Sequence, residues 1–237
     1  MAKKTAKRAA KKAATKKGQE GPPPRRVVVT AGPTREYIDP VRYLSNESSG
    51  LMGFEIAKAA AERGDDVVLI AGPVHQPTPD GVTRVDVTSA RDMLEALREH
   101  FPECDVLIMA AAVADFRPKR RLAGKWRKKD DGTDTATIEL VKNPDLLATI
   151  ARRKGERLVV GFALETGDGV RRALGKMRRK NADFVVLNDA SALGATTTSV
   201  TVLGRDGSAR EIRGRSKSHV ARHLVRLERP RTAAAGR

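Results

Sequence analysis

The sequence predicts an α/β domain with a Rossmann-like, doubly wound and mostly parallel sheet, a mobile lid loop and a small C-terminal β-hairpin. Short apolar runs, such as Val27–Val29, recur along the 237 residues and have the length of buried strands. Segments with apolar residues at helical spacing lie between them, and glycine or proline separates the two kinds of segment. Strands that alternate with helices are typical of a parallel sheet covered on both faces.

The first half of the chain follows this alternation. The strand at 27–29 leads through a turn at 31–33 into a long loop, and the next helix stops at Gly64, a favourable C-terminal residue. Ser89 and Asp92 have the spacing of a capping box at the start of a second helix. We therefore expect a helix at 50–63, strands at 66–70 and 84–87, and a helix from 89 to 98.

The second half continues with the apolar strand Val106–Met109. Residues 117–131 are basic, contain glycine and lack periodicity, which predicts the lid loop. Pro144 after Asn143 is suited to a helix start. We further expect strands at 137–141, 158–162 and 184–187, a basic helix at 170–180, a hairpin of 200–203 with 211–213 around the turn 204–207, and a last helix at 217–227.

Charge divides the chain into a tail and a body. The formal net charge is +17, and residues 1–26 hold +9 of it, with ten basic residues and one acidic residue. We expect residues 1–25 to be a disordered, lysine- and alanine-rich tail with a proline linker, 26–229 to be the folded domain and 230–237 a short disordered tail. We interpret the tail as a solubilising segment with at most non-specific binding to nucleic-acid phosphates, and the cationic body favours anionic ligands.

Compartment and redox chemistry follow from simple observations. The longest apolar run, residues 106–114, is shorter than the roughly 20 residues of a membrane span, and no signal segment follows the basic N-terminus, so we expect a cytoplasmic protein. Cys104 is the only cysteine, which excludes an internal disulfide and predicts a small buried side chain. His219 and His223 have zinc-helix spacing without a glutamate or third ligand, so they are interpreted as a polar helix face.

The loop from Thr30 to Gly53 is the strongest candidate for a binding site. Ligands of doubly wound sheets bind beyond the carboxyl ends of the strands, and this loop leaves the first strand and ends at a helix start, where backbone N–H groups attract phosphate or carboxylate. An alternative interpretation is a serine N-cap followed by glycines needed for packing. The candidate binding residues in the loop are Gly32, Ser48, Ser49, Gly50 and Gly53.

Other candidates follow later strands. The small residues from Ala110 onward let a flat ring approach the backbone, and Asp115 can accept from its amino group, although a capping aspartate explains the same pattern. Lys125, Lys128 and Lys129 lie in the lid loop, while Lys176 and Lys180 are one helical turn apart and can grip a phosphate chain or simply be solvated.

Dinucleotide-binding and P-loop motifs are absent from the sequence, and the second strand ends without an acidic residue for a ribose. An NAD(P)-binding reductase is therefore the weaker alternative, and nucleic-acid binding through the tail is another.

Several blocks together resemble the phosphopantothenoylcysteine synthetase family, the phosphopantothenate-cysteine ligases of coenzyme A synthesis. The matching blocks cover nearly all of the chain after Arg26, and they are Thr30-Ala-Gly-Pro-Thr-Arg-Glu, Asp39-Pro-Val-Arg-Tyr-Leu-Ser-Asn-Glu-Ser-Ser-Gly-Leu-Met-Gly-Phe, Ala110-Ala-Ala-Val-Ala-Asp-Phe, Lys142-Asn-Pro-Asp, Gly161-Phe-Ala-Leu-Glu-Thr and Lys180-Asn-Ala-Asp.

The resemblance implies a two-step reaction. The carboxylate of 4′-phosphopantothenate attacks the α-phosphate of CTP with Mg²⁺, and the amine of L-cysteine then displaces CMP. It implies catalytic roles for Asn46, near the acyl-cytidylate, and for Lys125, which helps consume this intermediate. The nucleotide-binding positions it implies are Met109, Ala110, Ala111, Asp115, Lys125, Pro144, Asp145, Leu146, Leu147, Phe162, Lys176 and Lys180.

The resemblance also sets expectations about partners. It implies a homodimer, with residues of one subunit near the other's site, and a separate flavin-dependent decarboxylase that acts next. No decarboxylase segment or flavin is expected in this chain, which is interpreted as a stand-alone form. One departure is Arg127, which occupies the third place of the family's Lys-x-Lys-Lys pattern that starts at Lys125. The preference for CTP rests on the bacterial-like Ala-Val-Ala-Asp block alone.

Overall fold

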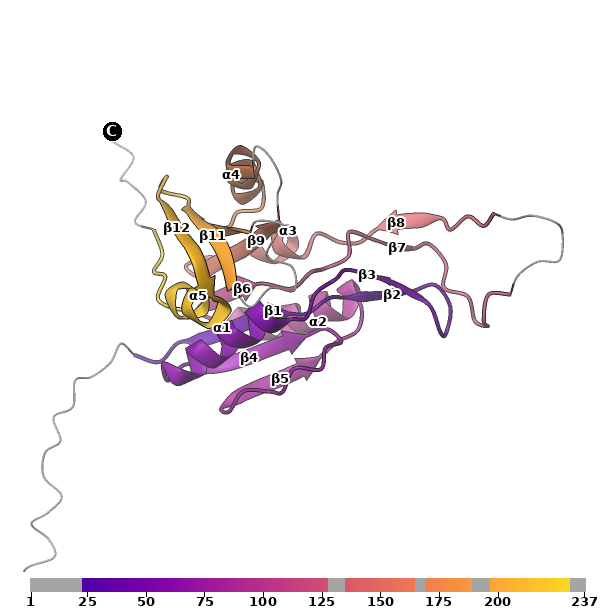
Figure 1. Ribbon diagram of the computed structural model, residues 1–237, viewed down its shortest axis with the longest axis horizontal. Helices are drawn as coiled ribbons and strands as arrows, with labels where there is room; N and C mark the ends of the chain where they lie inside the picture. Colours follow the sequence, from indigo (N-terminus) through magenta and orange to yellow (C-terminus); the bar gives the residue numbers. More distant parts are fainter. Residues whose placement is uncertain (1–22, 128–134, 165–168, 189–196, 231–237) are drawn as a thin grey trace, which may run out of the picture.

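An eight-stranded sheet forms the centre of the computed structural model, which describes residues 23–127, 135–164, 169–188 and 197–230. The strand order is β12-β11-β10-β9-β6-β1-β4-β5, and a long arm projects beyond the carboxyl ends of β1 and β6 (Figure 1). The strands are β1 (Arg26–Ala31), β4 (Asp66–Ala71), β5 (Val82–Asp86), β6 (Val106–Met109), β9 (Leu158–Leu164), β10 (Phe184–Asn188), β11 (Thr197–Gly204) and β12 (Ala209–Ser216). The predicted α/β fold class is confirmed.

Neighbouring strands from β5 to β10 pair in parallel, whereas β11 pairs antiparallel with both β10 and β12. Val27 of β1 pairs with Val67 of β4 on one side and with Val106 of β6 on the other. The chain builds outward from β1 through β4 to β5 and then returns to β6 on the opposite side of β1. This reversal places a topological switch point between the carboxyl ends of β1 and β6, where ligands of such sheets bind.

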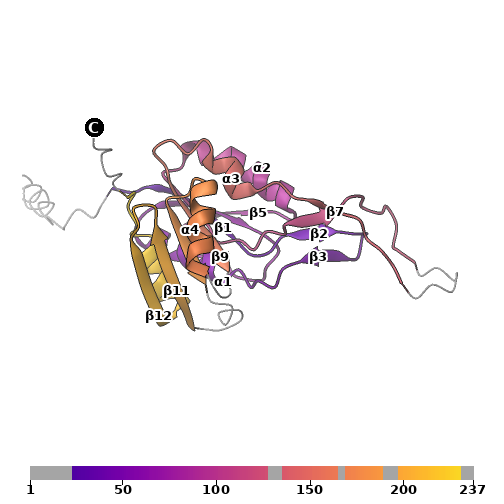
Figure 2. The ribbon, with the colours of Figure 1, turned by 90° about the horizontal axis from the view of Figure 1, so that it is seen from above.

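Helices cover both faces of the sheet because its strands are apolar on both sides (Figure 2). Val27 and Val29 of β1 face the layer of α1 and α5, while Val28 faces the layer of α2, α3 and α4. The helices are α1 (Leu51–Glu62), α2 (Ala90–His100), α3 (Leu146–Ala151), α4 (Gly169–Arg179) and α5 (Lys217–Leu224), and a short 3-10 helix, η1 (Phe101–Glu103), follows α2. The capping box predicted at Ser89 and Asp92 is confirmed by both of its hydrogen bonds.

The arm consists of two antiparallel pairs, β2 (Arg35–Tyr37) with β3 (Tyr43–Ser45) and β7 (Phe116–Pro118) with β8 (Leu140–Lys142). The long loop expected after the turn at 31–33 contains β2 and β3, and the strand expected at 137–141 is the shorter β8, so both expectations are corrected. These strands pair with one neighbour each and bury little apolar surface, so they lack the continuous apolar run that signals a central strand.

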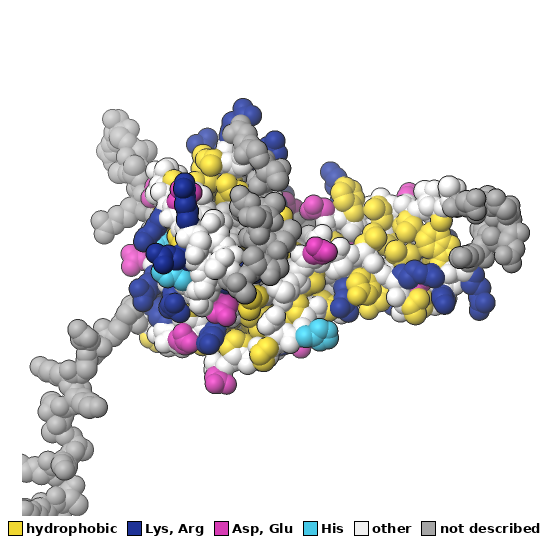
Figure 3. Space-filling view, viewed as in Figure 1, with side chains coloured by type: hydrophobic (Ala, Val, Ile, Leu, Met, Phe, Trp, Pro, Cys, Tyr) yellow, Lys and Arg dark blue, Asp and Glu magenta, His cyan; other side chains and the backbone are white. Residues whose placement is uncertain are grey.

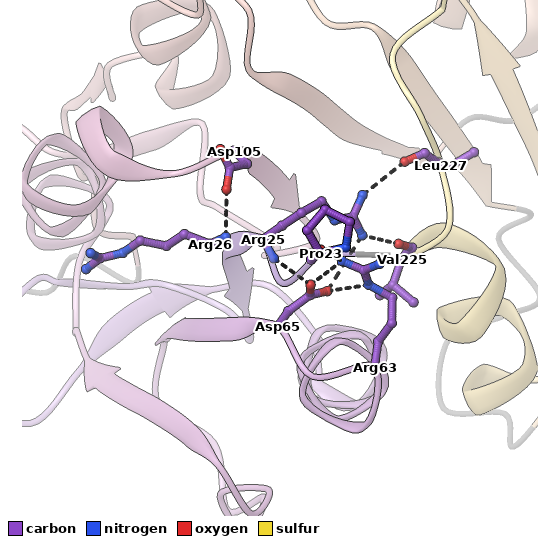
Figure 4. A network of polar contacts seen from close by, with 8 residues as sticks. All are labelled: Pro23, Arg25, Arg26, Arg63, Asp65, Asp105, Val225 and Leu227. Atoms are coloured by element: carbon purple, nitrogen blue, oxygen red, sulfur yellow. Dashed lines mark hydrogen bonds and ion pairs between the residues drawn. The ribbon is translucent and has the colours of Figure 1, made fainter. Parts of the chain in front are cut away.

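Charged side chains gather at the amino end of the inner strand β1 (Figure 4). The buried carboxylate of Asp65 accepts from the Arg25 N–H and from the guanidinium of Arg63, and the Arg25 guanidinium donates to the carbonyls of Val225 and Leu227. These bonds fasten the start of β1 to the segment that follows α5.

Cys104 is buried, as expected, and its burial raises the pKa of the thiol to about 12. Within the described part of the chain, no helix has the length and apolar character needed to cross a membrane.

Candidate ligand-binding site at the switch point

The chain segments that leave β1 and β6 run side by side beyond the sheet. Ala110 N donates to Thr30 O at 3.1 Å, Ala112 N donates to Gly32 O at 2.8 Å, and Thr34 N donates back to Ala112 O at 3.3 Å. The hydroxyls of the buried Thr30 and Thr34 accept from the N–H groups of Ala111 and Ala114. The backbone of the alanine-rich segment is therefore fixed at the switch point, with Ala110–Val113 half-buried.

Glycines allow three turns to meet beside this segment. Gly32 and Gly50 have φ of 77° and 75°, a region that disfavours side chains, and a Cβ on Gly50 would lie 3.3 Å from Gly32 Cα. A Cβ on Gly72 would lie 1.8 Å from Pro33 O, and one on Gly53 would lie 2.5 Å from Ala31 Cβ. Gly53 therefore serves the packing of α1 on β1, in agreement with the structural interpretation of the loop glycines.

Asn46 brings the loop and the alanine-rich segment together. Its side-chain Nδ2 donates to Ala112 O at 3.1 Å, and the residue is exposed. The neighbouring Ser45 donates through Oγ to Thr34 O at 2.8 Å, which holds the end of β3 in place. The amide oxygen of Asn46 makes no hydrogen bond to another described residue, and the residue is exposed at the switch point.

The serines before α1 do not cap the helix in the predicted manner. The N-cap is Gly50, and no side chain accepts a capping hydrogen bond from the first turn in the usual way. Ser48 Oγ instead accepts from Gly50 N at 3.3 Å, and Ser49 Oγ accepts from Leu51 N at 3.4 Å. The serine N-cap interpretation is therefore wrong, because the left-handed Gly50 turns the chain into the helix without a polar side chain.

Asp115 follows the alanine-rich segment and is exposed. Asn143 holds this residue from the other side, since Asn143 N donates to Asp115 O and its Nδ2 donates to Ala114 O, both at 2.8 Å. No helix begins at Asp115, which precedes β7, so the capping alternative for this residue is wrong. Asn143 does not begin α3 either, because the N-cap of that helix is Asp145.

A pair of opposite charges lies at the start of α3. Lys180 Nζ is 2.9 Å from Asp145 Oδ2, and Asp145 also accepts from Ala148 N at 3.0 Å. Partial burial acts to raise the pKa of Asp145, but the Ala148 N–H and the charges of Lys180 and Lys176 outweigh it and lower the pKa. The charges of Lys176 and Lys180 thus both stabilise the ionised form of the same carboxylate.

The apolar residues predicted to bind the nucleotide near this pair differ in how far they are buried. Leu146 and Leu147 are buried in the core layer of α2, α3 and α4, so their side chains are packing residues. A Cβ on Gly161 would lie 2.7 Å from Leu147 Cδ2, which explains the glycine before Phe162. Met109 is buried at the end of β6, whereas Phe162 and Pro144 are half-buried.

Lys125 is separate from these residues. It lies on the arm and is exposed, and among the described residues no hydrogen bond or ion pair joins it to Asn46 or to Asp145. Lys128 and Lys129 lie outside the described residues. Within one chain, the loop that contains Asn46, the alanine-rich segment and the Asp145–Lys180 pair lie in one region, and Lys125 of the predicted lid loop is separate from them.

Sequence reasoning missed several residues that build the site. Thr30, Thr34 and Glu36 are buried polar side chains, and each accepts a backbone N–H, from Ala111, Ala114 and Ala90. A polar residue directly after an apolar strand is the only sequence signal for such a role, and it does not identify the partner. Among the described residues, no group of three or more His, Cys, Asp or Glu side chains is arranged to hold a metal ion.

The fold and the residues at the carboxyl ends of β1 and β6 define a class of protein: a doubly wound α/β domain with a polar candidate site at its topological switch point. A family model described as the DNA/pantothenate metabolism flavoprotein C-terminal domain matches residues 23–228. The chain belongs to this family, and the resemblance found in the sequence is confirmed.

Named relatives agree with this placement. The chain is 50% identical over 171 residues to the coenzyme A biosynthesis bifunctional protein CoaBC of Vibrio cholerae, a match that covers 72% of the chain and 43% of the relative. It is 42% identical over 206 residues to the protein of the same name from Bacillus subtilis, covering 85% of the chain and 50% of the relative. The chain thus spans about half the length of these relatives.

A crystal structure of the C-terminal domain of coenzyme A biosynthesis bifunctional protein CoaBC is 41% identical and superposes with a TM-score of 0.73. The match covers 85% of the chain and 92% of that structure.

Proposed function

We propose that this chain is a phosphopantothenate-cysteine ligase of coenzyme A biosynthesis that acts through an acyl-cytidylate. The carboxylate of 4′-phosphopantothenate attacks the α-phosphate of CTP and releases pyrophosphate. The amine of L-cysteine then attacks the activated carbonyl and displaces CMP, which forms the amide of 4′-phosphopantothenoyl-L-cysteine. The family match to the second half of CoaBC proteins supports this proposal.

The observation that carries the proposal is the bond from Asn46 Nδ2 to Ala112 O, which joins the loop to the alanine-rich segment at the switch point. We assign the phosphopantothenate end to the loop side, where Ser48, Ser49 and the N-terminus of α1 offer donors to an anion. We assign the cytidine to the side of Ala110, Ala111 and Asp115. The reacting groups then meet beside Asn46, whose amide can donate to one oxygen and accept from the incoming amine.

The triphosphate is assigned to Lys176 and Lys180. In the free protein Lys180 pairs with Asp145, and both lysines influence that carboxylate. A nucleotide phosphate carries more negative charge than one carboxylate, so it competes for these cations.

Mg²⁺ neutralises phosphate charge when it is bound, and it usually takes few ligands from the protein and several from phosphate and water. The described residues contain no group of three or more His, Cys, Asp or Glu side chains arranged for a metal ion, which is compatible with coordination mainly by phosphate and water. The exposed Asp115 is a carboxylate within the candidate site.

We also propose that two copies pair through their arms. The arm exposes apolar side chains that a solvated hairpin does not need, and they form a patch on the surface (Figure 3). Its exposed large residues are Val41, Tyr43, Phe116, Leu122 and Leu140. Pairing would cover this patch and would let Lys125 of one copy approach the switch point of the other. A strictly monomeric active species in analytical ultracentrifugation would contradict this part of the proposal.

The proposal is tested by pyrophosphate release from the purified protein. We expect release only when CTP, 4′-phosphopantothenate and Mg²⁺ are all present, and formation of the amide only when L-cysteine is added. ATP in place of CTP tests the nucleotide preference in the same assay. Lack of turnover with both nucleotides would reject the ligase assignment, and saturable binding of NAD(P) in its place would favour the reductase alternative.

A further inference from the structure

The turn between β2 and β3 contains a buried carboxylate. The side chain of Asp39 has 0% exposure, although the next three residues of the turn are exposed. Its Oδ1 accepts from Val41 N at 2.7 Å and from Arg42 N at 2.8 Å, which is the hydrogen bonding of an Asx turn. Its Oδ2 accepts from Arg42 Nη1 at 2.6 Å and from Trp126 N at 3.0 Å. One oxygen thus builds the turn, while the other reaches a residue 87 positions away.

The same two side chains hold both polar backbone groups of Trp126. Asp39 accepts from its N–H, and Arg42 Nη1 donates to its carbonyl oxygen at 2.9 Å. The Trp126 N–H belongs to the peptide bond that Lys125 forms with Trp126, so the clamp acts directly on the backbone of Lys125. A third bond, from Leu122 N to Ile38 O at 2.8 Å, ties the start of this segment to the same turn. We call residues 122–127 the Lys125 segment.

Apolar packing contributes little to the position of the Lys125 segment. Leu122 is 36% exposed, Lys125 and Arg127 are exposed, and only Trp126 is half-buried. A cavity of about 580 Å³ lies beside the segment and is lined by Ile38, Leu122, Trp126 and Ile138 among others. Since tight packing is absent here, the polar bonds to Asp39 and Arg42 determine where the segment lies.

The carboxylate remains ionised under working conditions. Burial acts to raise the pKa of Asp39, but the N–H groups of Trp126, Val41 and Arg42 and the Arg42 charge outweigh it, and the pKa falls to about 2. A charged acceptor makes stronger hydrogen bonds than a neutral one, so the clamp keeps its full strength at neutral pH.

We propose that Asp39 is a positioning residue for the ligase reaction, because its carboxylate, together with Arg42, holds Trp126 and thereby presents Lys125 at a fixed point of the arm. This inference rests on the proposed function, in which Lys125 helps to consume the acyl-cytidylate. Asp39 itself touches no reacting atom in this scheme. It acts through Lys125, and this dependence is what the experiment measures.

The test uses Asp39→Asn in the full chain. An amide has one oxygen where the carboxylate has two, so the variant can satisfy the turn amides but turns an NH₂ group toward the N–H of Trp126 and the guanidinium of Arg42. Asp39→Ser, whose hydroxyl can still accept from turn amides, serves as a second variant if the first does not fold. Asp86→Asn is the matched control, because Asp86 is an exposed carboxylate on the edge strand β5 and is paired with Arg84 at 2.7 Å.

A kinetic cycle separates positioning from simple structural support. We expect Asp39→Asn to slow consumption of the acyl-cytidylate about 10- to 100-fold in single turnovers, as misplacement of a reacting group does. In a Lys125→Ala background the same substitution should have no further effect, because its target is gone. An equal loss in both backgrounds would overturn the proposal.

Trp126 is the only tryptophan, so its fluorescence reports on the clamp without any need for turnover. We expect acrylamide quenching to increase in Asp39→Asn and to stay at the wild-type level in Lys125→Ala and Asp86→Asn. Unchanged quenching in the Asp39 variants would refute the clamp even if the ligase assay succeeds. Failure of the wild-type ligase assay with increased quenching in Asp39→Asn would instead reject the proposed function and leave the clamp in place.

Discussion

Replacement of Asn46 by alanine should separate activity from stability more clearly than any other change at the switch point. The side chain is exposed and makes one described hydrogen bond, to Ala112 O at 3.1 Å. That carbonyl also accepts from Thr34 N, so Asn46→Ala leaves no buried acceptor without a partner. The loss in unfolding free energy should therefore be about 1 kcal/mol or less, or roughly 2–4 °C in Tm for a chain of this size.

The effect on catalysis should be much larger. Removal of one oriented donor near developing charge typically slows a reaction about 100-fold, which corresponds to about 2.7 kcal/mol of transition-state stabilisation. The assay is amide formation with saturating CTP, 4′-phosphopantothenate and L-cysteine, alongside a thermal melt of each variant. Pyrophosphate release in the absence of cysteine shows in addition which of the two steps is slowed.

Ser45→Ala is the matched control for this experiment. Ser45 is the adjacent residue, is also exposed, and likewise donates to a backbone carbonyl at the switch point, that of Thr34. We expect it to lose as little stability as Asn46→Ala while it retains turnover. If the two variants form the amide at rates within about two-fold of each other, Asn46 has no special role and the chemistry lies elsewhere in the loop.

Two further predictions concern the fold. Gly72→Ala should destabilise the chain by about 3 kcal/mol or more and lower Tm by roughly 6–12 °C, because the new Cβ meets a backbone oxygen that no rotamer change can move. Gly124→Ala, with open space around it, is the control in the same thermal melts. Equal Tm values for the two variants would contradict the close approach of Gly72 to Pro33. Cys104 should resist a thiol reagent at pH 8 until the chain unfolds, because burial keeps the thiol neutral up to a pKa of about 12. The Cys104 thiol titrates near its ordinary pKa of 9.0 when the chain is unfolded, so the contribution of the buried neutral thiol to stability is complete below pH 9 and is lost as pH rises toward 12. In the thiol-reagent experiment, one fast-reacting thiol in the native protein would show that Cys104 is accessible.

The centre of the sheet was predictable because its inner strands, β1, β4, β6 and β9, are buried on both faces. The predicted strands all occur in the sheet apart from the one at 137–141, and β6 has the predicted bounds, Val106–Met109. The first helix and the terminal hairpin are also confirmed. Their sequence signals were clear, because Gly64 marks the end of the helix and residues 204–207 form the turn of the hairpin. The arm was not predictable in the same way. Arg35–Tyr37 and Tyr43–Ser45 are three residues each and half exposed, so neither shows a period of two long enough to detect.

The site was predictable as a region and not as a set of contacts. The rule that ligands bind at strand carboxyl ends places Thr30–Gly32 and Met109–Ala112 at one edge, and the register of β1 with β6 confirms that they are neighbours. Which atoms meet depends on how the two segments continue past the sheet. The bonds from Ala111 to Thr30 and from Asn46 to Ala112 link residues 81 and 66 positions apart, and no local pattern encodes such distances.

The glycines of the loop show why a sequence motif alone left two interpretations open. A glycine-rich loop before a helix fits a phosphate site and a tightly packed turn equally well. Here the close approaches of Gly53 to Ala31 and of Gly72 to Pro33 are between parts of the protein, and Gly32 lies against Gly50 in the same way. These glycines bring three turns together and leave little room for a ligand between them. The groups that remain free to meet one are the polar side chains on the outside of this packed unit, and Asn46 is the one whose donor is already fixed to the alanine-rich segment. Catalytic specificity at this edge should therefore follow substitutions of Asn46 and its neighbours, whereas substitutions of the glycines should act first on folding.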